Sequence, residues 1–140
     1  MQLIAHLNFN GNCEEAFNLY AQALGGEIQS INRYSEAPSG PDVPPEWSNK
    51  IMHVTLVAGD QTLMGCDAPP SHYHAPAGIT VTIQLNDVAS TERVYNAMTE
   101  GAKITMPLQQ TFWSPRFGMF TDRFGIPWMI NCAQAAQQSA

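Results

Sequence analysis

Residues 12–28, NCEEAFNLYAQALGGEI, decide the fold because residues 87–104, DVASTERVYNAMTEGAKI, echo them in the second half of the chain. Each stretch begins with a residue suited to cap a helix, Asn12 or Asp87, and reaches a glycine after nearly the same number of residues. Apolar residues recur at helical spacing between these ends, and strand-like runs flank both stretches. A half-length repeat of this kind predicts two similar units in one paired fold.

In the first unit, the run from Leu3 to Phe9 alternates apolar residues with mostly polar ones, which predicts a strand whose polar face includes His6 and Asn8. We expect Asn12 to cap the following helix, with Glu15 three residues later. The expected buried stripe of that helix is Ala16, Phe17, Tyr20, Ala23 and Leu24. Further strands are expected near residues 27–34, 50–58 and 62–67, with Gly59-Asp60 as a tight hairpin turn.

The second unit repeats this order. Residues 78–86 alternate, and the polar face of this expected strand carries Thr80, Thr82 and Gln84. A helix over residues 87–100 is expected to bury Val94, Ala97 and Met98. Strands near residues 103–106, 117–122 and 126–131 should complete the unit.

The length of 140 residues fits one domain. It divides into a first module at about residues 1–67, a proline-rich linker at 68–77, a second module at about 78–132 and a polar tail at 133–140. Residues 35–46 hold four of the ten prolines, so we expect a loop there that forms neither helix nor strand. The loop can serve as a lid over a site or as an inert surface excursion, and the sequence leaves both open.

The composition limits the classes of binding partner that we expect. The net charge is −6, and the six lysines and arginines are scattered, so no basic stripe points to nucleic acid. No targeting signal or long apolar run indicates a membrane, and we expect a cytoplasmic protein. Cys13, Cys66 and Cys132 lie far apart without zinc spacing, which is typical of reduced thiols. Cys13 could be activated by a helix start, but a small buried residue is the favoured interpretation.

The polar strand faces point to a binding site. If the apolar faces pack on the helices, the opposite faces carry His6, Asn8, Thr80, Thr82 and Gln84. A curled sheet with such residues predicts a polar-lined cavity for a small molecule. A sheet face that is simply wet by solvent is the alternative.

Several motifs carry a family resemblance. They are Phe9-Asn10-Gly11-Asn12-Cys13-Glu14-Glu15-Ala16-Phe17 through Tyr20 and Leu24-Gly25-Gly26, Ile51-Met52-His53, Leu63-Met64 with Asp67, Thr111-Phe112-Trp113, Phe117-Gly118 and the closing run Thr121–Asn131. Together they resemble the glyoxalase/bleomycin-resistance, or vicinal oxygen chelate, superfamily, and more closely its PhnB-like branch. The resemblance implies an α+β fold of two βαβββ modules, with curled mixed sheets around a cavity, and commonly a homodimer.

The resemblance also bears on metal chemistry. Metal-using members place ligands on the first and last strands of each module, and here Ala5 and Met129 stand at two of those positions. We therefore expect neither the standard metal site nor a cofactor. A divalent metal ion could still find an irregular site at His6, His53 and Asp67, with Glu46 or Asp122 as a distant base. His53 is also interpreted as an ordinary hairpin residue.

Two functional hypotheses follow. In the first, a metal-free protein binds a small planar or apolar ligand against Trp113, Phe117 and Trp128, with His6 and Asn8 orienting it. Those aromatic residues could instead belong to the core.

In the second hypothesis, a divalent-metal-dependent lyase, isomerase or dioxygenase acts on vicinal oxygens of a small substrate. Members of the branch are often labelled as similar to a 3-demethylubiquinone 3-methyltransferase. The sequence does not support methyl transfer, because the glycines follow helices and form no glycine-rich strand-to-helix turn.

Overall fold

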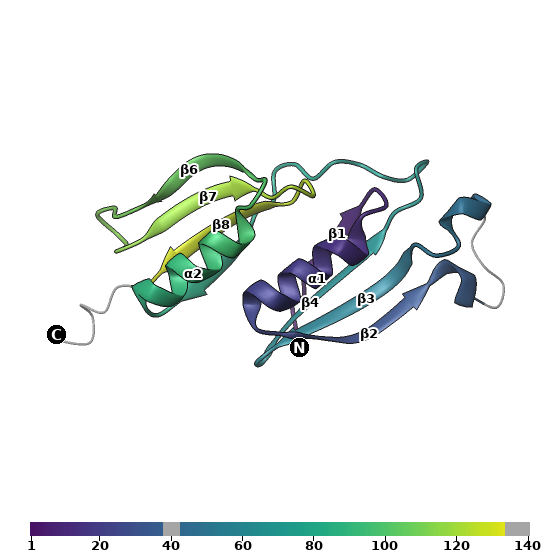
Figure 1. The fold of residues 1–140 in the computed structure, drawn as a ribbon, viewed down its shortest axis with the longest axis horizontal. Coiled ribbons are helices and arrows are strands. Elements are labelled where there is room, and N and C mark those ends of the chain that lie inside the picture. Colours follow the sequence, from purple (N-terminus) through teal and green to yellow (C-terminus); the bar gives the residue numbers. More distant parts are fainter. Residues whose placement is uncertain (38–42, 134–140) are drawn as a thin grey trace. The chain divides into compact units, whose positions relative to one another are not determined.

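The computed structural model describes residues 1–37 and 43–133. The chain forms two compact units, Met1–Ala75 and Pro76–Ala140. Each unit contains one four-stranded mixed sheet and one α-helix, in the order strand, helix and three further strands (Figure 1). The predicted α+β repeat is therefore confirmed within each unit.

The first unit is built on a sheet with the strand order β1-β4-β3-β2, in which β1 runs parallel to β4 and the other pairs are antiparallel. Helix α1 lies across one face of this sheet (Figure 1). The elements are β1 (His6–Phe9), α1 (Cys13–Leu24), β2 (Glu27–Arg33), β3 (Ile51–Ala58) and β4 (Gln61–Asp67), with short 3₁₀ turns η1 (Tyr34–Glu36) and η2 (Pro45–Trp47).

Aromatic residues fix the packing of α1 on this sheet. The ring of Phe9 lies 5.9 Å from Phe17 and 6.5 Å from Tyr20, centroid to centroid, and all three are buried. A Cβ atom added to Gly65 would come within 2.5 Å of the Phe17 ring, so β4 needs a glycine where the helix presses on it. Because Leu7 and Phe9 face the helix, His6 and Asn8 face the other way.

A buried carboxylate organises the start of α1. Asn12 occupies the N-cap position but makes no side-chain capping bond, so the predicted asparagine cap is wrong. Instead, Oδ1 of Asp67 accepts hydrogen bonds from the backbone N–H groups of Gly11 and Cys13, each at 2.9 Å. Its Oδ2 accepts from the Ile51 N–H at 2.9 Å, and its backbone carbonyl accepts from the Tyr34 hydroxyl at 2.6 Å. Asp67 thus joins the helix start, β3 and η1.

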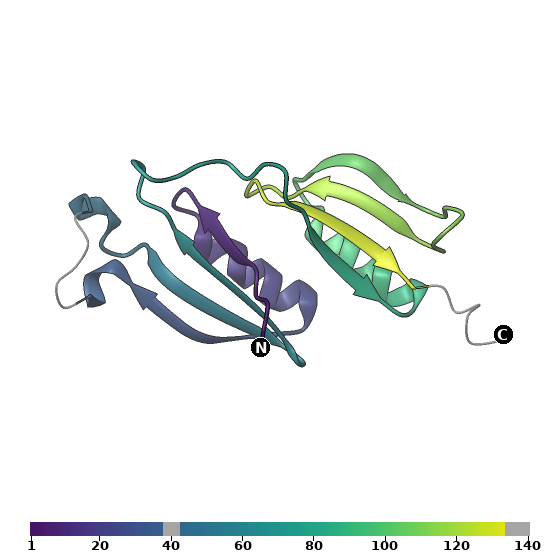
Figure 2. The same ribbon diagram turned by 180° about the vertical axis from the view of Figure 1, so that it is seen from behind.

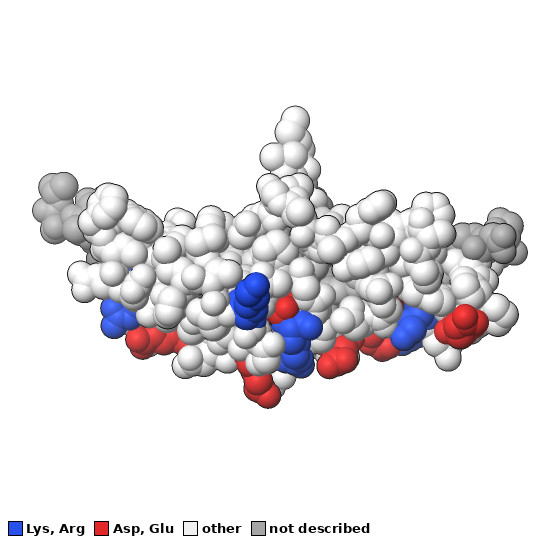
Figure 3. Space-filling view, turned by 90° about the horizontal axis from the view of Figure 1, so that it is seen from above, with Lys and Arg blue, Asp and Glu red and all other residues white. Residues whose placement is uncertain are grey.

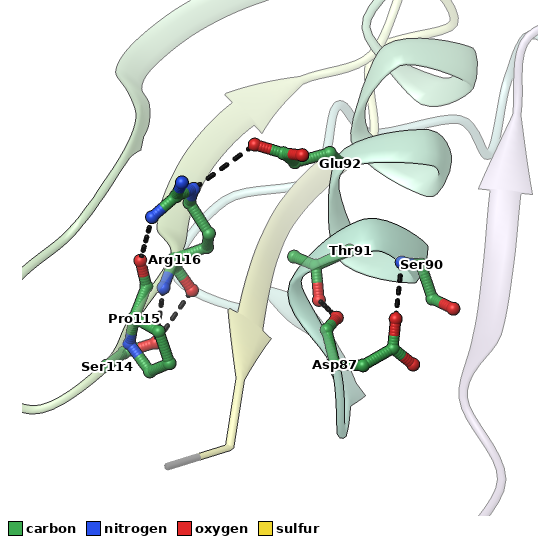
Figure 4. Close-up of polar contacts among 7 residues, drawn as sticks. All are labelled: Asp87, Ser90, Thr91, Glu92, Ser114, Pro115 and Arg116. Atoms are coloured by element: carbon green, nitrogen blue, oxygen red, sulfur yellow. Dashed lines mark hydrogen bonds and ion pairs between the residues drawn. The ribbon is translucent and has the colours of Figure 1, made fainter. Parts of the chain in front are cut away.

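The second unit has the strand order β5-β8-β7-β6, with β5 parallel to β8. Figure 2 shows these strands in front of α2. The predicted cap of α2 is confirmed, because Oδ1 of Asp87 accepts from the Ser90 N–H at 2.7 Å (Figure 4). The elements are β5 (Val81–Leu85), α2 (Val88–Met98), β6 (Lys103–Gln109), β7 (Phe117–Thr121) and β8 (Pro127–Cys132).

The turn between β7 and β8 depends on Asp122. Its Oδ1 accepts from the N–H groups of Phe124 and Ile126, each at 2.9 Å, and its Oδ2 accepts from Nε1 of Trp128 at 2.8 Å. Asp122 is 4% exposed and Trp128 is 2% exposed. Both residues therefore serve the core of this unit.

The element boundaries differ from expectation mainly at the edges. The first strand starts at His6, because Leu3 is exposed, and β6 continues to Gln109. Ala23, Leu24 and Ala97 are only half-buried, and the segment expected to be a plain loop forms η1 and η2 at its ends. Residues 38–42 of that segment and residues 134–140 of the predicted tail lie outside the described residues. In the described part of the chain, no helix is long and apolar enough to cross a membrane.

The Asp67 carboxylate leads to a stability prediction. Asp67→Asn puts an amide N–H against donors that now bond to a carboxylate oxygen, and we expect it to lower the free energy of unfolding by about 2–4 kcal/mol. Asp60→Asn is the matched control, because Asp60 is exposed and its carboxylate accepts a hydrogen bond from the exposed side chain of Gln61. Urea unfolding should show a change within about 0.5 kcal/mol for the control. Equal stability of the two variants would contradict the role assigned to Asp67.

Candidate functional site

The first unit presents a polar surface on the side of its sheet away from α1. We call it the first face, and its residues are adjacent in register: His6 pairs with Met64, which pairs with Thr55, and Asn8 pairs with Cys66. His53 is next to the helix-facing Val54 in β3 and therefore lies on the first face. Of the predicted site residues, the first face brings together His6, Asn8 and His53.

The two histidines of the first face are neighbours. Their ring centroids are 5.7 Å apart. Partial desolvation lowers the pKa of His6, and the nearby His53 lowers it further. Both effects favour the neutral imidazole, which can both donate and accept a hydrogen bond.

Cys66 is the one cysteine on this face. Its thiol donates to Oδ1 of Asn8, with the sulfur 3.2 Å from the oxygen. Burial raises the pKa of Cys66, and Asp67 adds to the effect. Cys13 is fully buried and burial raises its pKa strongly, so the interpretation of Cys13 as a packed residue fits the structure. All three cysteines are free thiols.

The hypothetical metal ligands do not converge. Asp67 is 1% exposed, and its carboxylate already accepts three backbone N–H groups. Only His6 and His53 remain adjacent, and among the described residues no three His, Cys, Asp or Glu side chains are grouped so that they could hold a metal ion. This donor set does not fit a divalent ion. Asp122 was considered above as a distant base, but its carboxylate accepts backbone hydrogen bonds within the turn between β7 and β8.

A pocket of about 540 Å³ lies elsewhere in the first unit, at the start of α1. Its charged lining residues are Glu14, Glu15, Glu46, Lys50 and Asp67. Glu14 pairs with Arg33 at 2.8 Å, Nζ of Lys50 donates to the Gly11 carbonyl, and Asp67 accepts the three backbone N–H groups described above. Sequence reasoning did not predict this pocket, whose residues come from α1 and the segment before it, from η2 and the segment that follows it, from the start of β3 and from the end of β4.

The second unit presents a different surface on the side of its sheet away from α2. Register defines it as two adjacent rows, which we call the second face: Thr82, Met129, Met119 and Met106 in one row, and Gln84, Asn131, Phe117 and Gln109 in the other. All of these side chains are partly or fully exposed. The exposed Thr80 precedes β5. Trp128 lies on the opposite side in the core, so it does not belong with the predicted cavity residues.

An aromatic loop adjoins the second face. Phe112 is 92% exposed and Trp113 is 45% exposed. The Trp113 ring lies 4.8 Å from Phe112 and 5.3 Å from Phe117, centroid to centroid, in edge-to-face geometry. The three rings form a continuous series from the loop to the sheet.

Hydrogen bonds hold this loop in place. Ser114 is fully buried, and its hydroxyl lies 2.7 Å from the carbonyl oxygens of both Arg116 and Cys132. Arg116 in turn pairs with Glu92 at 3.3 Å and donates to the Pro115 carbonyl (Figure 4). These hydrogen bonds hold the loop backbone in the conformation that leaves Phe112 and Trp113 exposed.

The arrangement of the elements defines a structural class. The chain has the fold of the glyoxalase/bleomycin-resistance, or vicinal oxygen chelate, superfamily. A bleomycin resistance determinant encoded on the transposon Tn5 has the same fold, with a TM-score of 0.60, 12% identity and coverage of 96% of this chain and 98% of the other.

Closer relatives identify the branch. The chain belongs to the family described as 3-demethylubiquinone-9 3-methyltransferase, whose model matches residues 1–131. It is 32% identical to the protein YjdN of Escherichia coli K12, over 94% of this chain and 95% of the relative. The structure of PA1353 from Pseudomonas aeruginosa is similar at 43% identity and a TM-score of 0.87, covering 96% of this chain and 98% of the other. The PhnB protein from Bacillus cereus is similar at 24% identity and a TM-score of 0.79, covering 95% and 100%.

The histidine pair predicts a pH dependence. The pKa of His6 should lie below about 6.5 in an NMR titration, and His53→Gln should raise it by removing a neighbouring charge. Because the pKa of His6 is lower in the folded chain than in the unfolded chain, the unfolded chain binds more protons as the solution becomes acidic. The stability that neutral His6 contributes is therefore present above the pKa of His6 in the unfolded chain, and it is lost as pH falls through the pKa of His6 in the folded chain. An unchanged His6 titration in the variant would disprove the coupling.

Thiol accessibility tests the first face. Cys13 and Cys132 are 0% and 1% exposed, whereas Cys66 is half-buried on the open side of the sheet. We expect an aromatic disulfide reagent to titrate one thiol per native chain, slowly, and three in urea. Cys66→Ser should remove the native reaction. Reaction of two or more native thiols would show that this packing is wrong.

Proposed function

We propose that the protein binds a small, planar, mostly apolar molecule on the second face, with Phe117 and Trp113 as the main contact surface. The observation that carries this proposal is the series of rings from the exposed Phe112 and Trp113 to the half-buried Phe117, on a loop held by a buried serine. Neither metal chemistry nor methyl transfer is part of the proposal.

The physical argument rests on exposed apolar area. An aromatic side chain in water forgoes about 25 cal/mol for each Å² that it could bury. Here the loop geometry keeps Phe112 and Trp113 outside the core instead of letting them fold inward. A surface fixed in this way loses little conformational entropy when it binds a ring, which favours affinity.

Methionines extend the platform. Met119 and Met129 are paired in register next to Phe117 and are half-buried. Thioether side chains are flexible and make favourable contacts with aromatic rings. Flexible methionine side chains can adapt to flat ligands of different outline.

The first face supplies polar candidates. In the first unit taken by itself, His6 and Asn8 remain proposed polar contacts for a small molecule. In the second unit, Thr80, Thr82 and Gln84 are the proposed polar contacts. We also propose a cytoplasmic homodimer, because free thiols are typical of reducing compartments and such dimers are expected from the family resemblance.

A binding experiment tests the proposal. Calorimetric titration with neutral two-ring aromatics, namely 1-naphthol, indole and quinoline, should detect binding, and Trp113→Ala should weaken it about tenfold. The matched control is Ile79→Ala, which removes an exposed apolar residue, 76% accessible, that lies outside the second face. If all three compounds fail to bind, or if both variants lose affinity equally, the proposal is wrong.

A further inference from the structure

We infer that three methionines of the second face, Met106, Met119 and Met129, form a modification site for peroxide, and that their oxidation to sulfoxides weakens ligand binding there. The inference rests on the proposed function, because it names a regulation of the same surface. It adds a chemical property of the second face that the sequence analysis did not single out.

The three thioethers lie in one row across three neighbouring strands. Met106 in β6 pairs with Met119 in β7, and Met119 pairs with Met129 in β8. Directly paired residues share a face of the sheet, with Cβ atoms about 4.5–5.5 Å apart. Phe117 is two residues from Met119 in β7 and therefore lies on the same face, in the next row. Three of the seven methionines of the chain are thus concentrated beside the aromatic platform.

These side chains are accessible to a dissolved oxidant and lie outside the core. All three are half-buried, on the side of the sheet away from α2. Met98 of α2 differs, because it is 0% exposed and belongs to the core. Because oxidation follows exposure, the row can be modified in the folded chain while Met98 is protected.

Hydrogen peroxide is the oxidant in this inference. A lone pair of the thioether sulfur attacks one peroxide oxygen, so that the S–O bond forms while the O–O bond breaks. The departing hydroxide takes the proton of the transferred oxygen, and the products are one sulfoxide and one water. The sulfur is oxidised by two electrons and the peroxide is reduced by two. Methionine sulfoxide reductases return both sulfoxide epimers to the thioether, so the modification is reversible.

A sulfoxide makes this face more polar. None of the second-face residues is ionisable, and much of the surface visible in Figure 3 carries no charge. The sulfoxide oxygen accepts hydrogen bonds, which water supplies in the free protein. A ring without a donor removes that water when it covers the oxygen, and the lost hydrogen bond weakens binding. The fold does not carry the same penalty, because the row is open to water in the free chain.

The test compares binding before and after peroxide treatment of the Cys66→Ser chain, which lacks the half-buried thiol. Peptide mass spectrometry should find sulfoxide at Met106, Met119 and Met129 and none at Met98. Calorimetry should then show the affinity for quinoline reduced about tenfold. The affinity for 1-naphthol or indole should fall less, because these two carry a donor for the sulfoxide oxygen. Reductases for both epimers should restore binding, and circular dichroism should stay native throughout.

Leucine variants assign the effect. Replacing all three methionines of the row, by Met106→Leu, Met119→Leu and Met129→Leu, keeps the apolar volume and removes the thioethers. Binding should persist in this variant and change less than about twofold after peroxide. The matched control is Met64→Leu, because Met64 is also half-buried but lies on the first face. The control should lose affinity for quinoline on oxidation as the parent chain does. Mapping and reductase rescue use the parent chain, so they test the inference even if the triple variant does not fold.

The outcomes separate the inference from the proposed function. If quinoline, 1-naphthol and indole all fail to bind the untreated chain, both are wrong. Three results would overturn the inference and leave the proposed function standing: Met119 and Met129 stay reduced while Met64 is oxidised, binding is unchanged after their oxidation, or the loss of affinity persists in the folded leucine variant. The expected loss, its reversal by the reductases and its absence in the leucine variant support both.

Discussion

The buried carboxylate of Asp67 is the interaction on which the first unit depends. Its hydrogen bonds join the start of α1 to β3, and its backbone carbonyl accepts a hydrogen bond from the hydroxyl of Tyr34 in η1. With the helix start held at the end of β4, α1 lies over Leu7, Phe9 and Gly65. His6 and Asn8 are then left on the open side. The same bonds use the oxygens that a metal ion would need, so the fold and the chemistry of this unit are linked through one residue.

The second unit reaches the same topology by other means. Asp87 caps its helix directly, and Asp122 organises the last hairpin turn. Ser114 lies beside the start of β7 and the end of β8, and its hydroxyl fixes the loop that carries Trp113. The two units therefore share the order of their elements but not the hydrogen bonds that hold those elements in place. This divergence gives the two faces different chemistry: imidazole, thiol and amide groups on the first, and thioethers and rings on the second.

Local patterns predicted the elements well and the site only in part. Glycine stops, alternation and the Asp87 cap depend on neighbours in sequence, and the structure confirms them. The cap supplied by Asp67 comes from a residue far along the chain, so no local pattern points to it. Trp128 and Phe117 look alike in sequence, since both lie in strands with apolar residues on both faces. Alternation alone puts Met129 and Asn131 on one face of β8, but the residues beside them, Met119 and Phe117, follow only from cross-strand register.

The most direct test of the account uses methionine methyl groups as reporters of where a ligand lies. In a chain labelled with [methyl-¹³C]methionine, Met119 and Met129 report on the second face, Met64 on the first face, and the buried Met98 on the core behind the second sheet. Titration with 1-naphthol should shift the Met119 and Met129 signals strongly, through ring currents, and leave Met98 nearly unchanged. Shifts confined to Met64, or no shift at Met119 and Met129, would contradict the claim that the second face is the binding surface.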